Sequence, residues 1–383
     1  MYTVETSKHF TKYVDFVTGV ESYILNNDAA PLQKPVYFAS KSTSTDMRYF
    51  WFVCAFPPQG LLEGSAMTMA CLDLETDEIY YHPDVPAGSP AIDPDTGDLY
   101  YTTQNLILKK GPKPDSPVIR IAKVPKEWRL FPGRVASHLT FSADKKELFC
   151  DVGSGNEVYL SSCNIETGEF QLWHQLHGGW NHAQFNPVDN DLALFAMDFW
   201  QDYQTGIRER IGKTENGQLT RMWTIRRGEE PISHLPVYNE ASHEWWSGDG
   251  KKIYYCDWRY GIGCVNIETG ERTLVHPTGY RHGYSSADDK YFCADIFNYG
   301  DNFQWYRGCA TTVNFYNSET KRPIDVITRN PALYKYEEPC VYHIDAHPRF
   351  VFNDEYIAYC STVYGKPTVG FTSVDHLVHM TSR

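Results

Sequence analysis

Short runs of apolar residues alternate with turn-forming residues along most of the chain. The stretches SHLTFSADKKELFCDVGSGNEVYLSSCNIETGEFQLWH (137–174) and SHEWWSGDGKKIYYCDWRYGIGCVNIETGERTLVH (242–276) align through most of their length. Each reads as a strand, a turn rich in Asp, Asn and Gly, two further strands and a turn of the type ETGE. Weaker copies occur at 36–81, 89–103, 181–199, 281–297 and 346–374. The pattern indicates an internal repeat of about 45 residues with about four strands in each unit.

A repeat of this length and strand content is typical of a β-propeller blade. The units lie at about 36–84, 88–128, 136–177, 181–227, 242–277, 281–328 and 343–375. The last unit is one strand short. A strand from about 12–25 would complete it and close the ring, since an open propeller leaves strand edges unpaired. The sequence therefore predicts an all-β, seven-bladed β-propeller with residues 1–383 as a single domain; six or eight blades are the alternatives.

Composition and charge narrow the class of protein. A hydrophobic fraction of 42% is enough for a core, and an aromatic fraction of 15% favours β structure. The net charge of 35 − 48 = −13 disfavours a nucleic-acid partner. No apolar run reaches the length of a membrane span, about 18 residues. The first 20 residues lack the pattern of a signal peptide. We therefore expect a cytoplasmic protein without a membrane partner; the sequence does not indicate its oligomeric state.

Several of the ten cysteines recur at fixed places in the repeat. Cys150, Cys256, Cys293 and Cys360 end the second strand of their units, and no CxxC pair is present. Free cysteine is among the most buried residue types. We predict that these residues are core positions without thiol chemistry.

Histidines open five of the units at nearly the same register. Four lie six residues before an Asp or Asn in the first turn and one lies seven before: His138, His243, His282, His347 and, at seven, His182. Because the first strand of each blade lines the central channel, we expect five imidazoles to converge at one mouth of it. The alternative is that His is simply the consensus cap of this repeat.

A second group of polar residues lies beside the last of these histidines. His343, Asp345 and His347 alternate along YHIDAHPRF, so an extended strand places them on one face. Two imidazoles and a carboxylate suit Mn²⁺, Fe²⁺, Zn²⁺ or a similar ion. His282, which opens the preceding blade, would add a fourth ligand. The alternative is a polar strand end that binds no metal.

Four segments resemble the oligogalacturonate lyases, which are the polysaccharide lyases of family 22. They are GGWNHAQFNPVDND, SHEWWSGDGKKIYY, RHGYSSADDK and YHIDAHPRFVFND, and the resemblance runs loosely from about residue 140 to the end. It implies a seven-bladed propeller, with His243 as the catalytic histidine and His282 and His347 as metal ligands. The chain departs from the family where Asp345 replaces a His ligand and Tyr342 replaces a Gln, with His343 adjacent. Asp binds the same ions, and we expect a divalent metal, Mn²⁺ in particular.

The resemblance also implies an arginine, and residues near the same mouth of the channel are expected to contact the substrate. The family uses an Arg from the blade after the WNH-like segment, and Arg208 is the best match by spacing, with Arg210 next. Loops from insertions at 104–134 and 200–240 are expected over one face, where loops usually set specificity. The expected substrate-binding residues are His138, His182, Arg210, Trp180, Tyr284 and Arg349.

These residue types suit β-elimination of a uronic-acid glycoside. That reaction removes the proton at C5 and expels the oxygen at C4. A cation or an Arg neutralises the carboxylate, and a His near pKa 7 takes the proton. The predicted function is a lyase that cleaves anionic uronate oligosaccharides of the oligogalacturonide type, as in pectin degradation.

Several other functions are open. The substrate could be another uronate glycan, of the rhamnose–glucuronate or ulvan type. The same scaffold could carry a hydrolase, although no pair of carboxylates stands out at the register that opens the blades. A third alternative is a non-enzymatic propeller that binds a glycan or a protein. The fold by itself does not decide among these functions.

Overall fold

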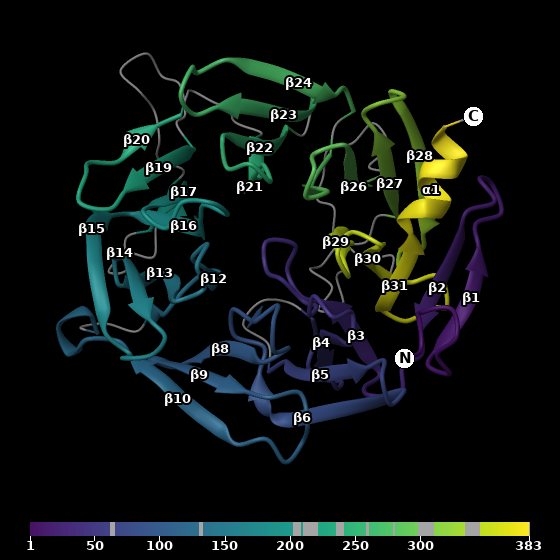
Figure 1. Ribbon diagram of the computed structural model, residues 1–383, viewed down its shortest axis with the longest axis horizontal. Helices are drawn as coiled ribbons and strands as arrows, with labels where there is room; N and C mark the ends of the chain where they lie inside the picture. Colours follow the sequence, from purple (N-terminus) through teal and green to yellow (C-terminus); the bar gives the residue numbers. More distant parts are fainter. Residues whose placement is uncertain are drawn as a thin grey trace.

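Seven antiparallel β-sheets surround a central axis in the computed structural model of the protein (Figure 1). The structure describes residues 1–61, 66–129, 133–201, 208–209, 221–234, 241–257, 260–278, 280–297, 310–333 and 345–382. The predicted all-β class and the seven-bladed propeller are confirmed. Neighbouring strands are consecutive in sequence in blades 1, 2, 5 and 6. In blades 3 and 4 the short strands β12 and β18 lie off the main order, and blade 7 combines strands from both ends of the chain.

The first three blades follow one another from the N-terminal side. Blade 1 is formed by β3 (Leu32–Pro35), β4 (Tyr49–Ala55), β5 (Thr68–Asp73) and β6 (Glu78–Pro86). Blade 2 is formed by β7 (Ala91–Ile92), β8 (Leu99–Thr103), β9 (Leu106–Lys110) and β10 (Val118–Lys123), followed by the 3-10 turn η1 (Lys126–Trp128). Blade 3 is formed by β11 (Gly133–Arg134), β12 (Thr140–Phe141), β13 (Glu147–Ser154), β14 (Glu157–Asn164) and β15 (Phe170–His177).

The remaining blades complete the circle. Blade 4 is formed by β16 (Gly179–Phe185), β17 (Leu192–Gln201), β18 (Arg208–Glu209), β19 (Met222–Arg226) and β20 (Ile232–Ser233). Blade 5 is formed by β21 (Ala241–Trp246), β22 (Lys252–Asp257), β23 (Gly261–Asn266) and β24 (Arg272–His276). Blade 6 is formed by β25 (Gly283–Ser285), β26 (Tyr291–Phe297), β27 (Thr311–Asn317) and β28 (Arg322–Asn330). Blade 7 combines β29 (Arg349–Val351), β30 (Tyr356–Ser361) and β31 (Thr368–Ser373) with β1 (Phe10–Val14) and β2 (Glu21–Leu25).

The ETGE segments form turns for a local reason. The side chain of Asn164 accepts hydrogen bonds from the backbone N–H groups of Glu166 and Thr167, at 2.9 Å each. Gly168 then takes a positive φ of 73°, which glycine adopts without steric cost. Asn266 and Gly270 repeat this arrangement in blade 5. The recurring sequence thus fixes the turn between the third and fourth strands.

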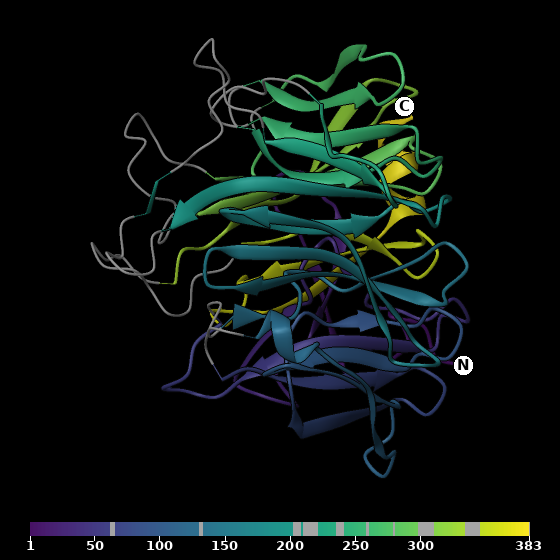
Figure 2. The ribbon, with the colours of Figure 1, turned by 90° about the vertical axis from the view of Figure 1, so that its left-hand side faces the viewer.

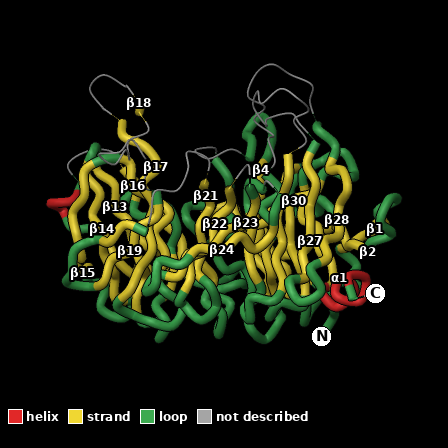
Figure 3. The backbone as a smooth tube through the Cα atoms, turned by 90° about the horizontal axis from the view of Figure 1, so that it is seen from above, coloured by secondary structure: helices red, strands yellow, loops and turns green. Residues whose placement is uncertain are grey.

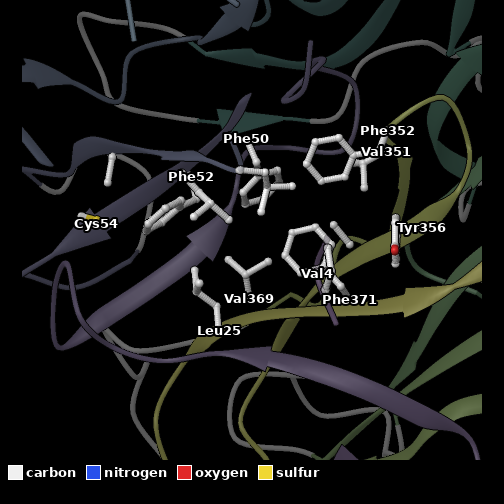
Figure 4. Close-up of a cluster of buried hydrophobic side chains, with 14 of the residues drawn as sticks. Val4, Leu25, Phe50, Phe52, Cys54, Val351, Phe352, Tyr356, Val369 and Phe371 are labelled. Carbon is white, nitrogen blue, oxygen red and sulfur yellow. The ribbon is translucent and has the colours of Figure 1, made fainter. Parts of the chain in front are cut away.

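The hydrophobic core is divided among the junctions between blades. Each of seven clusters of described buried residues joins two neighbouring blades. Figure 4 shows the one between blades 1 and 7, where Phe50 and Phe52 of β4 face Val369 and Phe371 of β31. The rings of Phe50 and Phe371 meet edge to face with centroids 4.8 Å apart. Burial of such apolar surface is the main favourable contribution to holding the blades together.

The N-terminal strands lie on the outside of the last blade. β2 pairs with β31, and β1 pairs with β2 (Figure 1). Asp15, in the turn between β1 and β2, accepts hydrogen bonds from the backbone N–H (2.8 Å) and hydroxyl (2.6 Å) of Thr328 in blade 6. The residues from about 12–25 that the sequence assigned to blade 7 lie in these two strands and their turn.

The two faces of the propeller are distinct. Adjacent strands of a blade are antiparallel. The first and third strands of each blade therefore run in the same direction and begin at the same face of the propeller. The helix α1 (Val374–Thr381) follows the end of β31 and therefore lies at the opposite face, at the C-terminal end of the chain (Figures 2 and 3). Among the described residues, no helix has the length and apolar character needed to cross a membrane.

Two further expectations can be compared with the structure. The eight described cysteines are free and buried, as predicted for core positions. The prediction of loop insertions at 104–134 was wrong, because this segment contains β9, β10 and β11. The recognisable copy of the repeat in this blade ends at residue 103, so the strands that follow it looked like an insertion.

Candidate functional site

Five histidine rings and one tyrosine ring form a closed circle around the channel. Successive members are in contact, with ring centroids 4.1–6.0 Å apart: His138 to His182, His182 to His243, His243 to His282, His282 to His347, His347 to Tyr37, and Tyr37 back to His138. The inner strands that carry or adjoin these histidines, among them β16, β21 and β29, lie toward the centre of Figure 1. The common register in the sequence thus becomes a ring of imidazoles.

The backbone turns these histidines toward the axis by local irregularities. His182 and His243 lie at β-bulges, where the pairing of β16 with β17 and of β21 with β22 shifts register. Both residues take positive φ values, 56° and 55°, and His347 does so at 44°. Residues other than glycine seldom adopt this conformation, and bulges re-aim side chains next to functional sites.

Tyr37 and Phe38 close the ring from blade 1. They follow β3, and Phe38 is fully buried with its ring against those of His243, His282 and His347. Arg349 donates a hydrogen bond from Nη1 to the carbonyl oxygen of Phe38 and lies over the ring of Tyr284. These contacts hold the segment in the channel.

His282, Asp345 and His347 form a cluster that could hold a metal ion. One ligand atom from each residue lies within 4.8 Å of the others. The Nδ1 of His282 lies 2.9 and 3.0 Å from the two carboxylate oxygens of the buried Asp295, so Nδ1 carries the hydrogen and the lone pair is on Nε2. This carboxylate–histidine pair is the usual arrangement behind a metal ligand.

Asp295 also organises the backbone around the cluster. It accepts hydrogen bonds from the backbone N–H groups of His282 (2.9 Å) and His347 (3.0 Å). Burial by itself would lower the pKa of His282, but the charge and hydrogen bond of Asp295 outweigh it and raise that pKa above its ordinary value. One carboxylate therefore fixes two of the three residues that could bind the ion.

His243 has a defined tautomer. Its Nδ1 donates a hydrogen bond to the carbonyl oxygen of Arg281, which can only accept, and Ser242 Oγ lies 2.8 Å from the same nitrogen. The lone pair is therefore on Nε2. Burial, followed by the neighbouring His282, His182 and Arg221, places the pKa of His243 well below its usual value. His243 is thus an uncharged imidazole with one basic nitrogen at neutral pH.

A buried ion pair of Arg221 and Glu244 lies beside His182 and acts on both His182 and His243. Glu244 is fully buried, and Arg221 donates to it from Nε (3.0 Å) and Nη2 (3.4 Å). The Nδ1 of His182 lies 3.5 Å from the same carboxylate. The guanidinium of Arg221 contributes to the low pKa of both histidines.

Other predicted site residues have different positions. Trp180 is 7% exposed and packs against Phe195 and Trp223 within blade 4, away from the ring. Tyr284 contacts Phe38 and Arg349, with no contact to the histidines of the circle among the described ring pairs. Arg349 is buried beside it.

Several predicted residues lie outside the described part of the structure. The backbone of Arg208 pairs with Gln201 in β18, but its side chain is not described. Arg210, Tyr342 and His343 lie outside the described residues. Their predicted roles stay predictions.

The sequence did not single out Tyr37, Arg221, Glu244 or Asp295. Tyr37 lies in the weaker copy of the repeat at 36–81. Arg221 comes just before MWTIR, the third strand of blade 4, and Glu244 and Asp295 each lie within an apolar strand. Arg221, Glu244 and Asp295 could have been noticed as charged residues inside or at the edge of a buried strand. Such residues are buried only when a partner neutralises them, so their positions predict ion pairs.

Comparisons with known proteins agree on the fold. No family model and no curated protein matches the sequence. An oligogalacturonate lyase in complex with manganese superimposes with a TM-score of 0.71 and 18% identity, over 95% of this chain and 96% of that one. The oligogalacturonate lyase of Vibrio parahaemolyticus gives 0.70 and 17%, over 95% and 96%. A puromycin hydrolase gives 0.54 and 13%, over 88% of this chain and 53% of the other. At these identities the likeness shows the propeller fold.

Proposed function

We propose that the protein is a lyase that cleaves uronate-containing oligosaccharides by β-elimination, with the aid of a divalent cation. The observation that carries the proposal is the position of His243. Its ring lies 4.1 Å from that of His282, one of the residues that could hold the ion, and its tautomer puts the lone pair on Nε2. A neutral base thus lies beside a cation site, which is the combination that the reaction needs.

His243 would act as the general base. Its Nε2 takes the proton from C5 of the uronate, and the electrons of that C–H bond form the C4–C5 double bond. The C4–O4 bond breaks, and the departing oxygen takes up a proton from water. Proton transfer by a positioned base typically contributes a factor of about 10²–10⁴ in rate.

The described residues fit a divalent cation. His282, Asp345 and His347 offer two imidazoles and a carboxylate, a set that suits Mn²⁺ among others, and Asp295 supplies the outer hydrogen bond that orients His282. When bound, the cation would neutralise the uronate carboxylate and so make the C5 proton more acidic. The manganese in the oligogalacturonate lyase structure supports this choice of ion.

Arg221 acts electrostatically on the proposed base and is itself paired with Glu244. Its side chain is 13% exposed, and its charge acts on both His182 and His243. Because Glu244 engages Nε and Nη2, the guanidinium is fixed in orientation. We propose that Arg221 helps to keep both histidines uncharged, and that Arg208 or Arg210 stabilises the charge that develops on the carboxylate.

A direct test is absorbance near 235 nm, where the unsaturated uronate product absorbs. The protein is mixed with galacturonate oligosaccharides and with oligosaccharides that contain glucuronate and rhamnose, first with EDTA and then with added Mn²⁺. Absorbance that rises only with Mn²⁺ supports the proposal and identifies the class of uronate. A rise unaffected by EDTA contradicts the role of the cation but keeps the elimination.

No rise in absorbance, together with saccharide binding measured by calorimetry, would contradict the enzyme and favour a binding propeller. The release of reducing sugar without absorbance would instead indicate a hydrolase. Each outcome therefore selects one of the functions that the sequence left open.

A further inference from the structure

We infer that the side of the ring formed by Tyr37, His138 and His182 is a subsite for an uncharged sugar. This sugar is the residue linked to O4 of the uronate, so the preferred substrate joins a neutral sugar to a uronate. The inference rests on the proposed function and specifies its substrate.

The three side chains form a continuous aromatic surface. Tyr37 stacks on His138 with ring centroids 4.6 Å apart and planes at 9°, and it meets His182 edge-on at 5.9 Å. His138 and His182 are themselves perpendicular at 5.0 Å. Around the circle this surface lies next to His347 on one side and His243 on the other. A sugar bound there would adjoin both the cation site and the base.

Among the described residues, Nε2 of His138 is buried and has no hydrogen-bond partner. Nδ1 of His182 is also buried and makes no hydrogen bond that meets the geometric criteria, although the carboxylate of Glu244 lies 3.5 Å away. His138 as a whole is 9% exposed. A buried polar atom without a partner costs free energy, so a ligand that satisfies Nε2 of His138 would bind favourably.

Sugar hydroxyls suit these atoms better than a carboxylate does. A neutral imidazole has one donor and one acceptor nitrogen, and a hydroxyl can complement either. A carboxylate only accepts. Because both nitrogens are buried, a hydroxyl reaches them only after a neighbouring ring shifts. Tyr37 is partly exposed and contacts both imidazoles, so it is the ring placed to make room.

The absence of net charge on this surface also favours an uncharged sugar over a second uronate. Burial lowers the pKa of His138 to about 4 and that of His182 well below its usual value, so both are neutral near pH 7. The charged groups that act on His138 form an ion pair, Arg134 with Asp151 at 2.9 Å. Arg221 beside His182 is paired with Glu244. A second uronate carboxylate here would lose its water without gaining a matching charge.

Two disaccharides of the same linkage test the inference. In both, the reducing residue is galacturonate; its O4 carries either a galactosyl or a galacturonosyl residue. We expect kcat/KM, followed by absorbance with Mn²⁺ present, to be at least about tenfold higher for the galactosyl compound. Equal values, or a preference for the galacturonosyl compound, would overturn the inference and leave the elimination intact.

A charge introduced at the subsite should reverse the preference. His138→Arg should favour the galacturonosyl compound, whereas His138→Gln, which stays neutral, should keep the original order. The matched control is His177→Arg on the outer strand of the same blade, where the side chain is 59% exposed; it should also keep the original order. If His177→Arg also reversed the preference, the effect of the charge would not be specific to the subsite, and this result would contradict the inference. If His138→Arg does not fold, the comparison in the unchanged protein decides.

Calorimetric titration separates the inference from the proposed function. If neither disaccharide is cleaved but the galactosyl compound binds more tightly, the subsite stands and the elimination fails. If both are cleaved and the galacturonosyl compound binds more tightly, the elimination stands and the subsite fails. If neither compound is cleaved or bound, both are wrong.

Discussion

The imidazole of His282 is anchored to the carboxylate of Asp295, with Nδ1 2.9 Å from Oδ2 and 3.0 Å from Oδ1. Asp295 also accepts a hydrogen bond from the backbone N–H of His347, so it links β26 of blade 6 to the segment that precedes β29 of blade 7. Both partners are buried, with His282 5% exposed and Asp295 fully enclosed. A buried pair of this kind fixes the ring orientation and the position of the lone pair.

Asp295→Asn should weaken Mn²⁺ binding about 10- to 100-fold, which is the usual effect of losing such an outer partner. The amide can still accept one hydrogen bond, but it carries no charge to hold His282. Calorimetric titration with Mn²⁺ measures the change. Asp257→Asn, a buried aspartate at the end of β22, is the control and should leave affinity unchanged. Equal affinity in both variants would exclude His282 as an oriented ligand.

His243→Gln should reduce kcat by about 10²–10⁴ while leaving Mn²⁺ affinity and the melting temperature nearly unchanged. Glutamine can keep the hydrogen bond to the Arg281 carbonyl, but it cannot accept a proton. His177→Gln on the exposed edge of blade 3 is the control. If Mn²⁺ affinity fell together with kcat, His243 would instead belong to the metal ligands.

Glu244→Gln should destabilise the fold by about 3–5 kcal/mol, because it leaves the guanidinium of Arg221 buried without its carboxylate. Arg221→Met added to Glu244→Gln should recover much of this loss. Urea unfolding of the two single variants and the double variant gives the coupling energy. Additive effects would show that the two side chains do not stabilise one another.

The burial of His276 should lower the free energy of unfolding in mild acid. His276 stacks on Tyr316 with centroids 4.0 Å apart, and neither of its ring nitrogens has a hydrogen-bond partner within the described part of the chain. Burial lowers its pKa from 6.5 to about 4. Between these pH values the unfolded chain binds a proton that the folded protein does not, so stability falls as the pH falls, by roughly 3 kcal/mol from this group.

The His276→Phe variant tests that contribution. Phenylalanine keeps the stacking and removes the titration. The difference in unfolding free energy between pH 7.5 and pH 4.5 should be roughly 3 kcal/mol smaller in the variant. An unchanged difference would mean that His276 already binds a proton in the folded protein.

The sequence by itself determined the architecture and much of the ring. The spacing of ETGE turns, apolar strands and acidic turns defines a repeat of about 45 residues. Each repeat forms one blade, and a blade can bury the two faces of its sheet only against the neighbouring blades. The histidines that precede Asp144, Asp249 and Asp288 share one place in that repeat. Closure of the ring of blades then brings these histidines to the central axis, where those of blades 5 and 6 meet.

Only the tertiary structure decided how the site is completed. Tyr37 enters the channel from the loop after β3, and Asp295 reaches His282 and His347 from a neighbouring strand. Arg221 meets Glu244 across the boundary between blades 4 and 5. The bulges at His182 and His243 depend on the pairing of two strands. Periodicity specifies positions within a blade. Loop paths, bulges and contacts between blades depend on packing among residues distant in sequence, which the repeat does not encode.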